Sequence, residues 1–418
     1  MSEHTYRVAR VITRLNIGGP SIQAIDLSRD LTFSGFETCL IHGHLAEGEG
    51  DMTKLLPLGD TGTVYIDDLV RPISPLRDLR AFWRIYRVFR RWRPDIVHTH
   101  MAKAGSLGRL AALVYNRTRG AGRRARLIHT YHGHVFEGYF GSPSTRSFLF
   151  VERWLGKRTD ALIAISPQVK KDLLETYGVA REEQLWLIPL GFNLDRLLAV
   201  SQKDREQARS SFQIPDAAVV VTTVGRLTAI KQHTLFLEMA ARLAKQSDRF
   251  MFLIAGDGEL RTALERRVKE LGLGARVRFL GWRGDLENVY GATDVFVLTS
   301  RNEGTPVALI EAMAAGVASV STDVGGVRDV VAGPHLGSLV PFGDAAALAG
   351  AVAALADAPA RRAEARAYGQ SADGRADGSS WPDRGPAQRA GSRDRRRPSP
   401  ARPRRGSPPR PVAADRGR

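Results

Sequence analysis

The chain has one cysteine, Cys39, in 418 residues, and no apolar run long enough to cross a bilayer. A single cysteine excludes an intramolecular disulfide and is typical of a reducing compartment. A membrane helix needs about 20 apolar residues, and the opening MSEHTYRVARVITRL lacks the apolar centre of a signal peptide. We therefore expect a cytoplasmic chain, whose length allows roughly two or three domains.

Aliphatic side chains almost disappear after residue 369. The last fifty residues hold 13 Arg and 5 Asp among Pro, Gly and Ser. Such a segment cannot bury enough apolar surface to offset the entropy cost of ordering, so we expect a disordered basic tail over 370–418. Two origins stay open. One is a shifted reading frame of a GC-rich gene, and the other is a genuine basic arm for nucleic acid or membrane.

Two segments begin with a strand, a glycine loop and a helix. The first is the β-rich run 6–13, which is followed by the sequence NIGGP and a helical pattern over 21–31. The second is VVVTTV from Val219, followed by Gly225 and the helical run TLFLEMAARLAK. This order is typical of doubly wound α/β domains, which bind ligands beyond the carboxyl ends of their strands. We predict two such domains, 1–190 and 191–369.

The stretch SRNEGTPVALIEAMAAG, residues 300–316, places two glutamates eight positions apart around a helix start. Thr305 is predicted to cap the helix, Pro306 to be its first residue, and Gly316 to follow its end. The unpaired N–H groups of a helix start attract a phosphate or a sugar hydroxyl. Glu303 and Glu311 should lie ~9–12 Å apart and have separate roles. A surface loop before an ordinary core helix remains the alternative.

Five histidines follow two further predicted strands, at positions 98, 100, 129, 132 and 134. No cysteine or carboxylate cluster accompanies them, so we favour no metal site. The segment 76–93 carries Leu79, Phe82, Tyr86 and Phe89 at helical spacing among seven arginines. It is either a core-packed helix with a solvated basic face or a helix that lies on an anionic membrane. We favour the core-packed helix because a buried strand follows directly.

The segments G-R-x-x-x-x-K from Gly225, T-x-H from Thr130 and E-x7-E from Glu303 resemble those of the retaining glycosyltransferases of family four. These enzymes have the two-domain GT-B fold. The resemblance implies that His132, Glu303 and the backbone after Glu303 meet the donor sugar, and that Glu311 binds the ribose. Arg226 and Lys231 would hold the diphosphate. The full set of residues implied on the donor side is Gly19, Gly225, Arg226, Lys231, Gly304, Thr305, Pro306, Val307, Ala308 and Glu311, and on the acceptor side Gly18, Lys103 and His134.

The resemblance also implies an activity. The chain would move a hexose with retention from a nucleotide sugar, UDP- or GDP-linked, to a glycan or lipid-linked acceptor in surface-polysaccharide synthesis. The sequence holds no D-x-D, the motif of metal-dependent glycosyltransferases, so we expect no metal or other cofactor. We expect no nucleic-acid partner, and peripheral contact with the inner face of an anionic membrane is open. A nucleotide-sugar 2-epimerase and an inactive sugar-nucleotide-binding protein are the alternatives.

Overall fold

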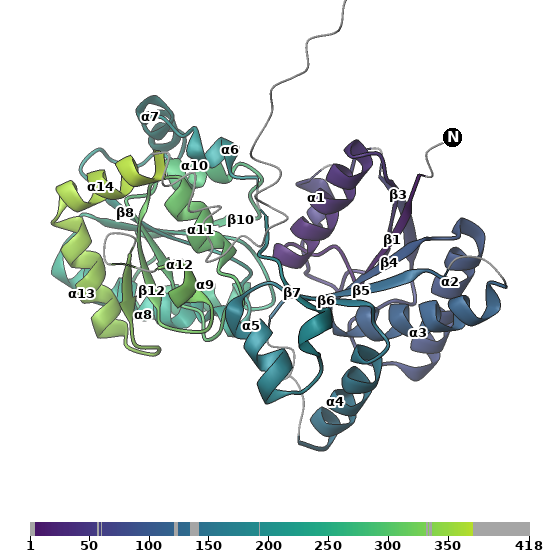
Figure 1. Ribbon diagram of the computed structural model, residues 1–418. Helices are drawn as coiled ribbons and strands as arrows, with labels where there is room; N and C mark the ends of the chain where they lie inside the picture. Colours follow the sequence, from purple (N-terminus) through teal and green to yellow (C-terminus); the bar gives the residue numbers. More distant parts are fainter. Residues whose placement is uncertain are drawn as a thin grey trace, which may run out of the picture. The chain divides into compact units, whose positions relative to one another are not determined.

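A computed structural model describes residues 5–56, 58–59, 61–120, 124–133, 142–191, 193–331, 333 and 337–370. The expected tail beyond residue 370 lies outside these ranges. Figure 1 shows two parallel sheets with helices against them. The fold class predicted from the sequence, two doubly wound α/β domains, is confirmed.

The first sheet has seven parallel strands in the order β3-β2-β1-β4-β5-β6-β7. Along the chain, helices of this first domain alternate with its strands, as a doubly wound topology requires. The elements are β1 Arg7–Ile12, α1 Gly19–Phe33, β2 Glu37–Gly43, η1 Met52–Lys54, β3 Gly62–Ile66, α2 Pro75–Trp92, β4 Ile96–His100, α3 Ala102–Thr118, β5 Arg126–Tyr131, α4 Ser142–Gly156, β6 Ala161–Ala164, α5 Pro167–Lys171, η2 Asp172–Thr176, η3 Glu182–Gln184 and β7 Leu185–Leu187.

The second sheet has six parallel strands in the order β10-β9-β8-β11-β12-β13. The elements of this second domain are α6 Asp195–Leu198, α7 Gln202–Ser211, β8 Val219–Val224, η4 Ala229–Lys231, α8 His233–Gln246, β9 Phe250–Ala255, α9 Arg261–Glu270, β10 Val277–Gly281, α10 Leu286–Gly291, β11 Val295–Leu298, α11 Val307–Ala314, β12 Ala318–Thr322, α12 Val327–Val330, β13 Ser338–Val340, α13 Ala345–Ala356 and α14 Pro359–Gln370.

Each sheet has an apolar core. Strand β9 reads FMFLIA and is buried at every position, since helices cover both faces of a parallel sheet. In the first domain, Ile85 and Phe89 of α2 pack with Val11 and Val97 of the central strands. The strand order changes direction between β1 and β4 and between β8 and β11. Ligands of such sheets bind beyond the carboxyl ends at these points.

Helix α2 departs from its predicted packing. Its bounds agree with the helical pattern over 76–93, but its buried residues are Ala81, Ile85 and Phe89. Leu79 is 56% exposed, so the prediction that it belongs to the packed stripe is wrong. Ala81, Ile85 and Phe89 pack in the first-domain core, and at about 100° per residue Leu79 projects well away from this side of the helix. Among the described residues, no helix combines the length and the apolar content that a bilayer crossing requires.

Candidate active site

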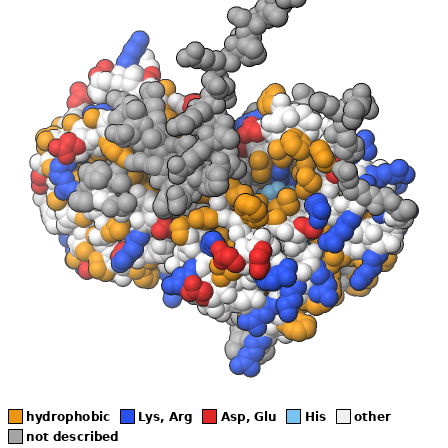
Figure 2. All heavy atoms as spheres, viewed as in Figure 1, with side chains coloured by type: hydrophobic (Ala, Val, Ile, Leu, Met, Phe, Trp, Pro, Cys, Tyr) orange, Lys and Arg blue, Asp and Glu red, His pale blue; other side chains and the backbone are white. Residues whose placement is uncertain are grey.

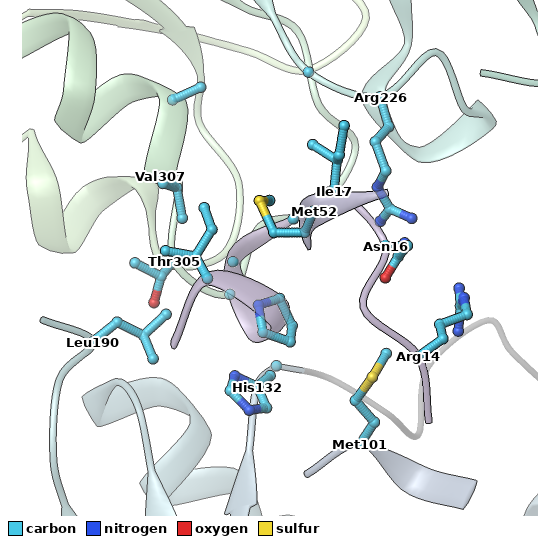
Figure 3. A pocket seen from close by; sticks show the side chains of 18 of the residues that line it. Arg14, Asn16, Ile17, Met52, Met101, His132, Leu190, Arg226, Thr305 and Val307 are labelled. Carbon is cyan, nitrogen blue, oxygen red and sulfur yellow. The ribbon is translucent and has the colours of Figure 1, made fainter. Parts of the chain in front are cut away.

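The strand ends of both domains line a single pocket of about 1620 Å³. The loops after β1, β4 and β5 contribute from the first domain, and those after β8 and β11 from the second. In Figure 3, Asn16, Met101 and His132 lie across the pocket from Thr305 and Val307 at the start of α11. The predicted residues on this lining are Gly18, Gly19, Lys103, His132, Gly225, Arg226, Lys231, Glu303, Gly304, Thr305, Val307, Ala308 and Glu311.

Lys231 and Glu303 form an ion pair on the pocket wall. The Nζ of Lys231 lies 2.6 Å from Oε1 of Glu303, and the hydroxyl of Ser300 donates to the same oxygen at 2.5 Å. Glu303 is 8% exposed, so Lys231 and Ser300 compensate a carboxylate that is almost removed from water. Strand order explains the contact, because η4 follows β8, Glu303 follows β11, and these strands are neighbours.

Glu311 points from α11 toward Tyr290. The Tyr290 hydroxyl lies 3.0 Å from Oε2 of Glu311 and 3.0 Å from the carbonyl oxygen of Ala308. Burial raises the pKa of Glu311 to about 7, and the Tyr290 hydrogen bond opposes this rise only in part. The carboxyl group therefore changes its protonation state near neutral pH, on a wall of the pocket.

The start of α11 differs from its predicted cap. The helix begins at Val307, Pro306 precedes it without a capping side chain, and the hydroxyl of Thr305 is buried without a hydrogen-bond partner among the described residues. The helix therefore begins one position later than predicted, and Thr305 does not cap it with its side chain. The amide of Val307 donates to the backbone carbonyl of Thr305 and not to its hydroxyl. Gly316 follows the helix with φ 69°, as a residue beyond a helix end should.

The loop from Glu303 to Gly304 is held closely on two sides. A Cβ on Gly304 would lie 3.0 Å from the carbonyl oxygen of His132. On the other side the amide of Gly326 donates to the carbonyl of Glu303 at 2.9 Å, and a Cβ on Gly326 would lie 2.1 Å from the carbonyl oxygen of Gly304. Glycine at these positions lets three backbone segments meet beside the pocket.

His132 is held by a second histidine. Its Nε2 lies 2.9 Å from Nδ1 of His100, and the ring of His98 packs 4.3 Å from that of His100. Burial lowers the pKa of His132 to about 3, and burial also lowers those of His98 and His100 well below the usual value. These imidazoles are neutral at physiological pH, so His132 can donate or accept a hydrogen bond there without acting as a charged acid.

Arg226 lies near a charged pair of the first domain. Arg14 donates through Nε to Glu49 at 2.7 Å. Burial raises the pKa of Glu49, but hydrogen bonds from Arg14 and the Ala46 amide, together with the charges of Arg14 and Arg226, outweigh it and leave the pKa below its usual value. Arg14, Arg226 and Lys231 therefore bring three cationic side chains to the pocket.

Of the residues predicted on the acceptor side, Gly18 and Lys103 line the pocket. Lys103 lines the pocket, but it forms an ion pair with Asp78 of α2 at 2.5 Å and donates to the carbonyl of Pro72. Gly18 and Gly19 line the pocket, and a Cβ on Gly19 would lie 3.3 Å from the Val307 side chain. His134 lies outside the described residues.

Several pocket residues were not predicted from the sequence. Glu152 lines the first-domain part of the pocket, where Arg109 donates to both of its oxygens at 2.7 Å and Tyr131 to one of them at 2.7 Å. Ser300 and Tyr290 were also missed; they are not on the pocket lining but form hydrogen bonds to the two glutamates that are. Residues that act through tertiary contacts carry no local pattern. Within the described residues, no group of three or more His, Cys, Asp or Glu side chains could hold a metal ion.

This arrangement can bind a phosphorylated sugar. Cations and a helix start lie beside buried carboxylates and a neutral imidazole on the wall of a pocket of about 1620 Å³. Phosphate oxygens would meet the cations and the amides, and sugar hydroxyls would meet the carboxylates.

Comparison with known proteins gives the same picture. Residues 17–196 match the family described as Glycosyltransferase Family 4, and residues 204–372 match Glycosyl transferases group 1. An Escherichia coli protein named UDP-Gal:alpha-D-GlcNAc-diphosphoundecaprenol alpha-1,3-galactosyltransferase is 32% identical over 67% of this chain and 71% of its own length. The putative glycosyltransferase EpsD of Bacillus subtilis is 28% identical over 70% of this chain and 76% of its own.

A solved structure has the same fold. The Anabaena protein Alr3699/HepE, crystallised with UDP-glucose, superimposes with a TM-score of 0.73 at 20% sequence identity. The match covers 87% of this chain and 93% of the Anabaena chain. These three findings agree: the family matches, the similarity to the galactosyltransferase and the shared fold. The chain therefore belongs to the family-four, group 1 glycosyltransferases with the GT-B fold.

Proposed function

We propose that this glycosyltransferase moves a hexose, with retention of configuration, from a UDP-sugar to a lipid-linked glycan acceptor at the inner face of a cell membrane. The observation that carries the proposal is the Lys231–Glu303 ion pair at the start of α11, with Arg226 on the same pocket. UDP is favoured over GDP because the galactosyltransferase relative is named for a UDP-sugar and the Anabaena structure holds one.

The donor would lie along the second domain. Its ribose would bond to the Glu311 carboxylate, and its diphosphate would meet Arg226, Lys231 and the amides at the start of α11. The sugar would lie between Glu303 and His132, whose backbone is in contact with the loop that carries Glu303. The acceptor would enter from the first domain, near Lys103 and Glu152.

The reaction breaks the bond between the anomeric carbon and the diphosphate oxygen. The acceptor hydroxyl attacks the same carbon from the face that the diphosphate leaves, and its proton passes to the departing diphosphate. Negative charge develops on the leaving group, so fixed cations stabilise the transition state more than the ground state. No protein nucleophile is needed in this scheme. Closing the pocket around the donor would exclude water that otherwise hydrolyses it.

Thermal melting with nucleotides tests the donor assignment. A ligand at 100 times its dissociation constant stabilises the folded protein by ~2.7 kcal/mol. We expect UDP to raise the melting temperature more than GDP or ADP does at equal concentration. Equal shifts with all three nucleotides, or a larger shift with GDP, would contradict the choice of UDP.

Product analysis tests the activity. Incubation with a UDP-hexose and an undecaprenyl-diphosphate glycan should yield UDP and an acceptor longer by one sugar, with the anomeric configuration of the donor retained in the product. Conversion of the donor to its 2-epimer without an acceptor would identify an epimerase instead. Binding of UDP with neither reaction would identify an inactive sugar-nucleotide-binding protein.

A further inference from the structure

Helix α2 presents apolar side chains to its surface on the side opposite its buried stripe. Leu76, Leu79 and Trp83 are spaced three and four residues apart and are 71%, 56% and 47% exposed. Ile73, two residues before the helix, is 74% exposed. Single exposed apolar residues are common on proteins, but four along one line mark an interaction site.

The same part of the chain is strongly basic. Residues 71–126 contain fifteen Arg and Lys and two Asp. Figure 2 shows Lys and Arg side chains gathered over the first domain around α2 and α3. Arg84 pairs with Asp68 at 3.1 Å, whereas no acidic side chain in the described part of the chain pairs with Arg80, Arg87 or Arg91. The positive charge of these three arginines is therefore not compensated by an ion pair in the described part of the chain, although other basic residues of this segment do pair with carboxylates.

The arginines and the apolar residues share one side of the helix. At about 100° per residue, Leu76, Trp83 and Arg87 lie within roughly 40° of one another, and Arg80 and Arg91 lie about 20° and 40° beyond Arg87. The buried Ile85 lies on the opposite side. This arrangement is typical of a helix that lies in the interface of a membrane, with its apolar side chains at the acyl boundary and its arginines at the phosphates.

We propose that this α2 face, defined as Ile73, Leu76, Leu79 and Trp83 with Arg80, Arg87 and Arg91, binds the surface of an anionic lipid bilayer. Arginines alone would also suit nucleic acid, but exposed leucine and isoleucine add nothing to phosphate binding. The Trp83 ring packs edgewise against Phe82 at 5.2 Å and Tyr86 at 5.6 Å, and indole rings are enriched at membrane interfaces.

The α2 face adjoins the pocket. Arg71, Pro72 and Ile73 line the pocket, and Lys103 joins the pocket to the first turn of α2 through Asp78. A bilayer on this face would therefore bring a lipid-linked acceptor to the mouth of the pocket. This consequence rests on the proposed function, whereas membrane binding itself does not.

Flotation with vesicles tests the face in the full chain. Vesicles of phosphatidylcholine with about 30% phosphatidylglycerol should bind the protein, and pure phosphatidylcholine vesicles should bind it at least about tenfold more weakly. L79S/W83S should lower the partition coefficient about tenfold or more, because it removes two apolar groups from the interface. Its matched control is F33S/W186S, which replaces side chains that are 82% and 59% exposed elsewhere and should change binding less than about twofold.

Charge reversal gives a second matched pair. R87E/R91E should lower the partition coefficient about tenfold or more, since each basic residue at an anionic surface contributes a several-fold factor. R242E/R266E makes the same change of charge on exposed positions of α8 and α9 and should have a much smaller effect. The basic tail is present in all four proteins, so any difference between the pairs comes from the face itself.

Equal losses in the test and control pairs would overturn the proposal, and so would equal binding to neutral and anionic vesicles. Tight binding to duplex DNA that R87E/R91E abolishes and R242E/R266E does not, without flotation, would make the face a nucleic-acid interface and would also overturn the proposal. UDP should still raise the melting temperature of L79S/W83S and R87E/R91E. If UDP no longer raises the melting temperature of these two variants, their fold is damaged. If UDP does not raise the melting temperature of the wild type, the proposed function is contradicted but the membrane-binding face is not.

Discussion

Lys231 compensates the buried carboxylate of Glu303 and would compensate the diphosphate when the donor is bound. Replacing Lys231 or Arg226 by alanine should lower kcat about 10²–10³-fold, by analogy with the loss of one oxyanion donor. The measurement is the initial rate of UDP release in the presence of acceptor. The control is Lys170→Ala, which removes a half-buried lysine that pairs with Glu182 at 2.8 Å and does not line the pocket, and its rate should equal that of the wild type. A near-normal rate for Arg226→Ala and Lys231→Ala would refute their assignment to the diphosphate.

Glu311 should make donor binding depend on pH. Under the proposed function, a ribose hydroxyl would donate to the ionised carboxylate of Glu311, and burial raises the pKa of this group to about 7. The affinity for UDP should therefore fall as the pH is lowered through 7, by about tenfold per pH unit below it. Titration calorimetry between pH 5.5 and 8.5 measures the effect. Glu311→Gln should bind UDP more weakly at pH 8 and should lose the part of the pH dependence that comes from Glu311. The pH dependence that remains in this variant comes from other groups, such as the nucleotide phosphate.

The same carboxyl group affects the stability of the protein without nucleotide. Its pKa is raised in the folded state, so the folded state holds the proton between about pH 4.5 and 7 when the unfolded state has lost it. Glu311 therefore stabilises most at low pH, and this contribution, about 3 kcal/mol at most, is lost as the pH rises through 7. Denaturant unfolding of the wild type and Glu311→Gln at several pH values measures the difference, which should shrink toward low pH.

At the scale of elements, the loop before α11 depends on the glycine turn after β12. Gly326 has φ −74°, which alanine adopts easily, so Gly326→Ala tests only the contact with the Gly304 carbonyl at 2.1 Å. The added methyl group should move the loop, lower the melting temperature by several degrees and weaken UDP binding about tenfold or more. Gly350→Ala in α13 is the control, because its Cβ meets nothing within 4 Å, and it should be neutral or stabilising. Unchanged UDP binding by Gly326→Ala would show that the turn does not position the loop.

Much of the fold could be predicted because parallel strands and glycine turns are local patterns. The strand Val219–Val224 and the placement of Gly225 and Arg226 after it follow from such patterns. Local reasoning failed where packing decides. Thr305 suits a helix cap by residue type, yet a backbone carbonyl takes that role. In α2, apolar residues on several sides left the buried side undetermined, and the structure buries the side that carries Ala81, Ile85 and Phe89.

The candidate site was predicted as separate motifs but not as contacts. Lys231 and Glu303 were assigned to different parts of a donor, and their ion pair spans 72 positions in the chain. Ser300 and Tyr290 are ordinary residues in sequence, and only the order of the strands brings them to the glutamates. Contacts of this kind depend on the sheet topology, which a single sequence does not reveal residue by residue.

At the scale of the whole molecule, the basic tail should be dispensable for donor binding. The family match in the second domain ends at residue 372, and the described structure ends at residue 370 with α14, which packs against α11 and α13. A chain that stops after Gln370 should therefore bind UDP within about twofold of the full chain and melt within a few degrees of it. Calorimetry and thermal melting of both chains measure this. A truncated chain that melts much earlier would show that the tail contributes to the fold.

The two halves of the pocket respond differently to acidity. The histidines at the ends of β4 and β5 remain uncharged throughout the physiological range because burial lowers their pKa values. On the other wall, Glu311 gains its proton near neutrality. Lowering the pH from 8 to 5.5 should therefore raise the Michaelis constant for the donor through the titration of Glu311, whereas the histidines add no change of charge, as steady-state kinetics of the wild type and Glu311→Gln can measure. In the proposed reaction, acidification would therefore slow sugar transfer by emptying the enzyme of its activated sugar.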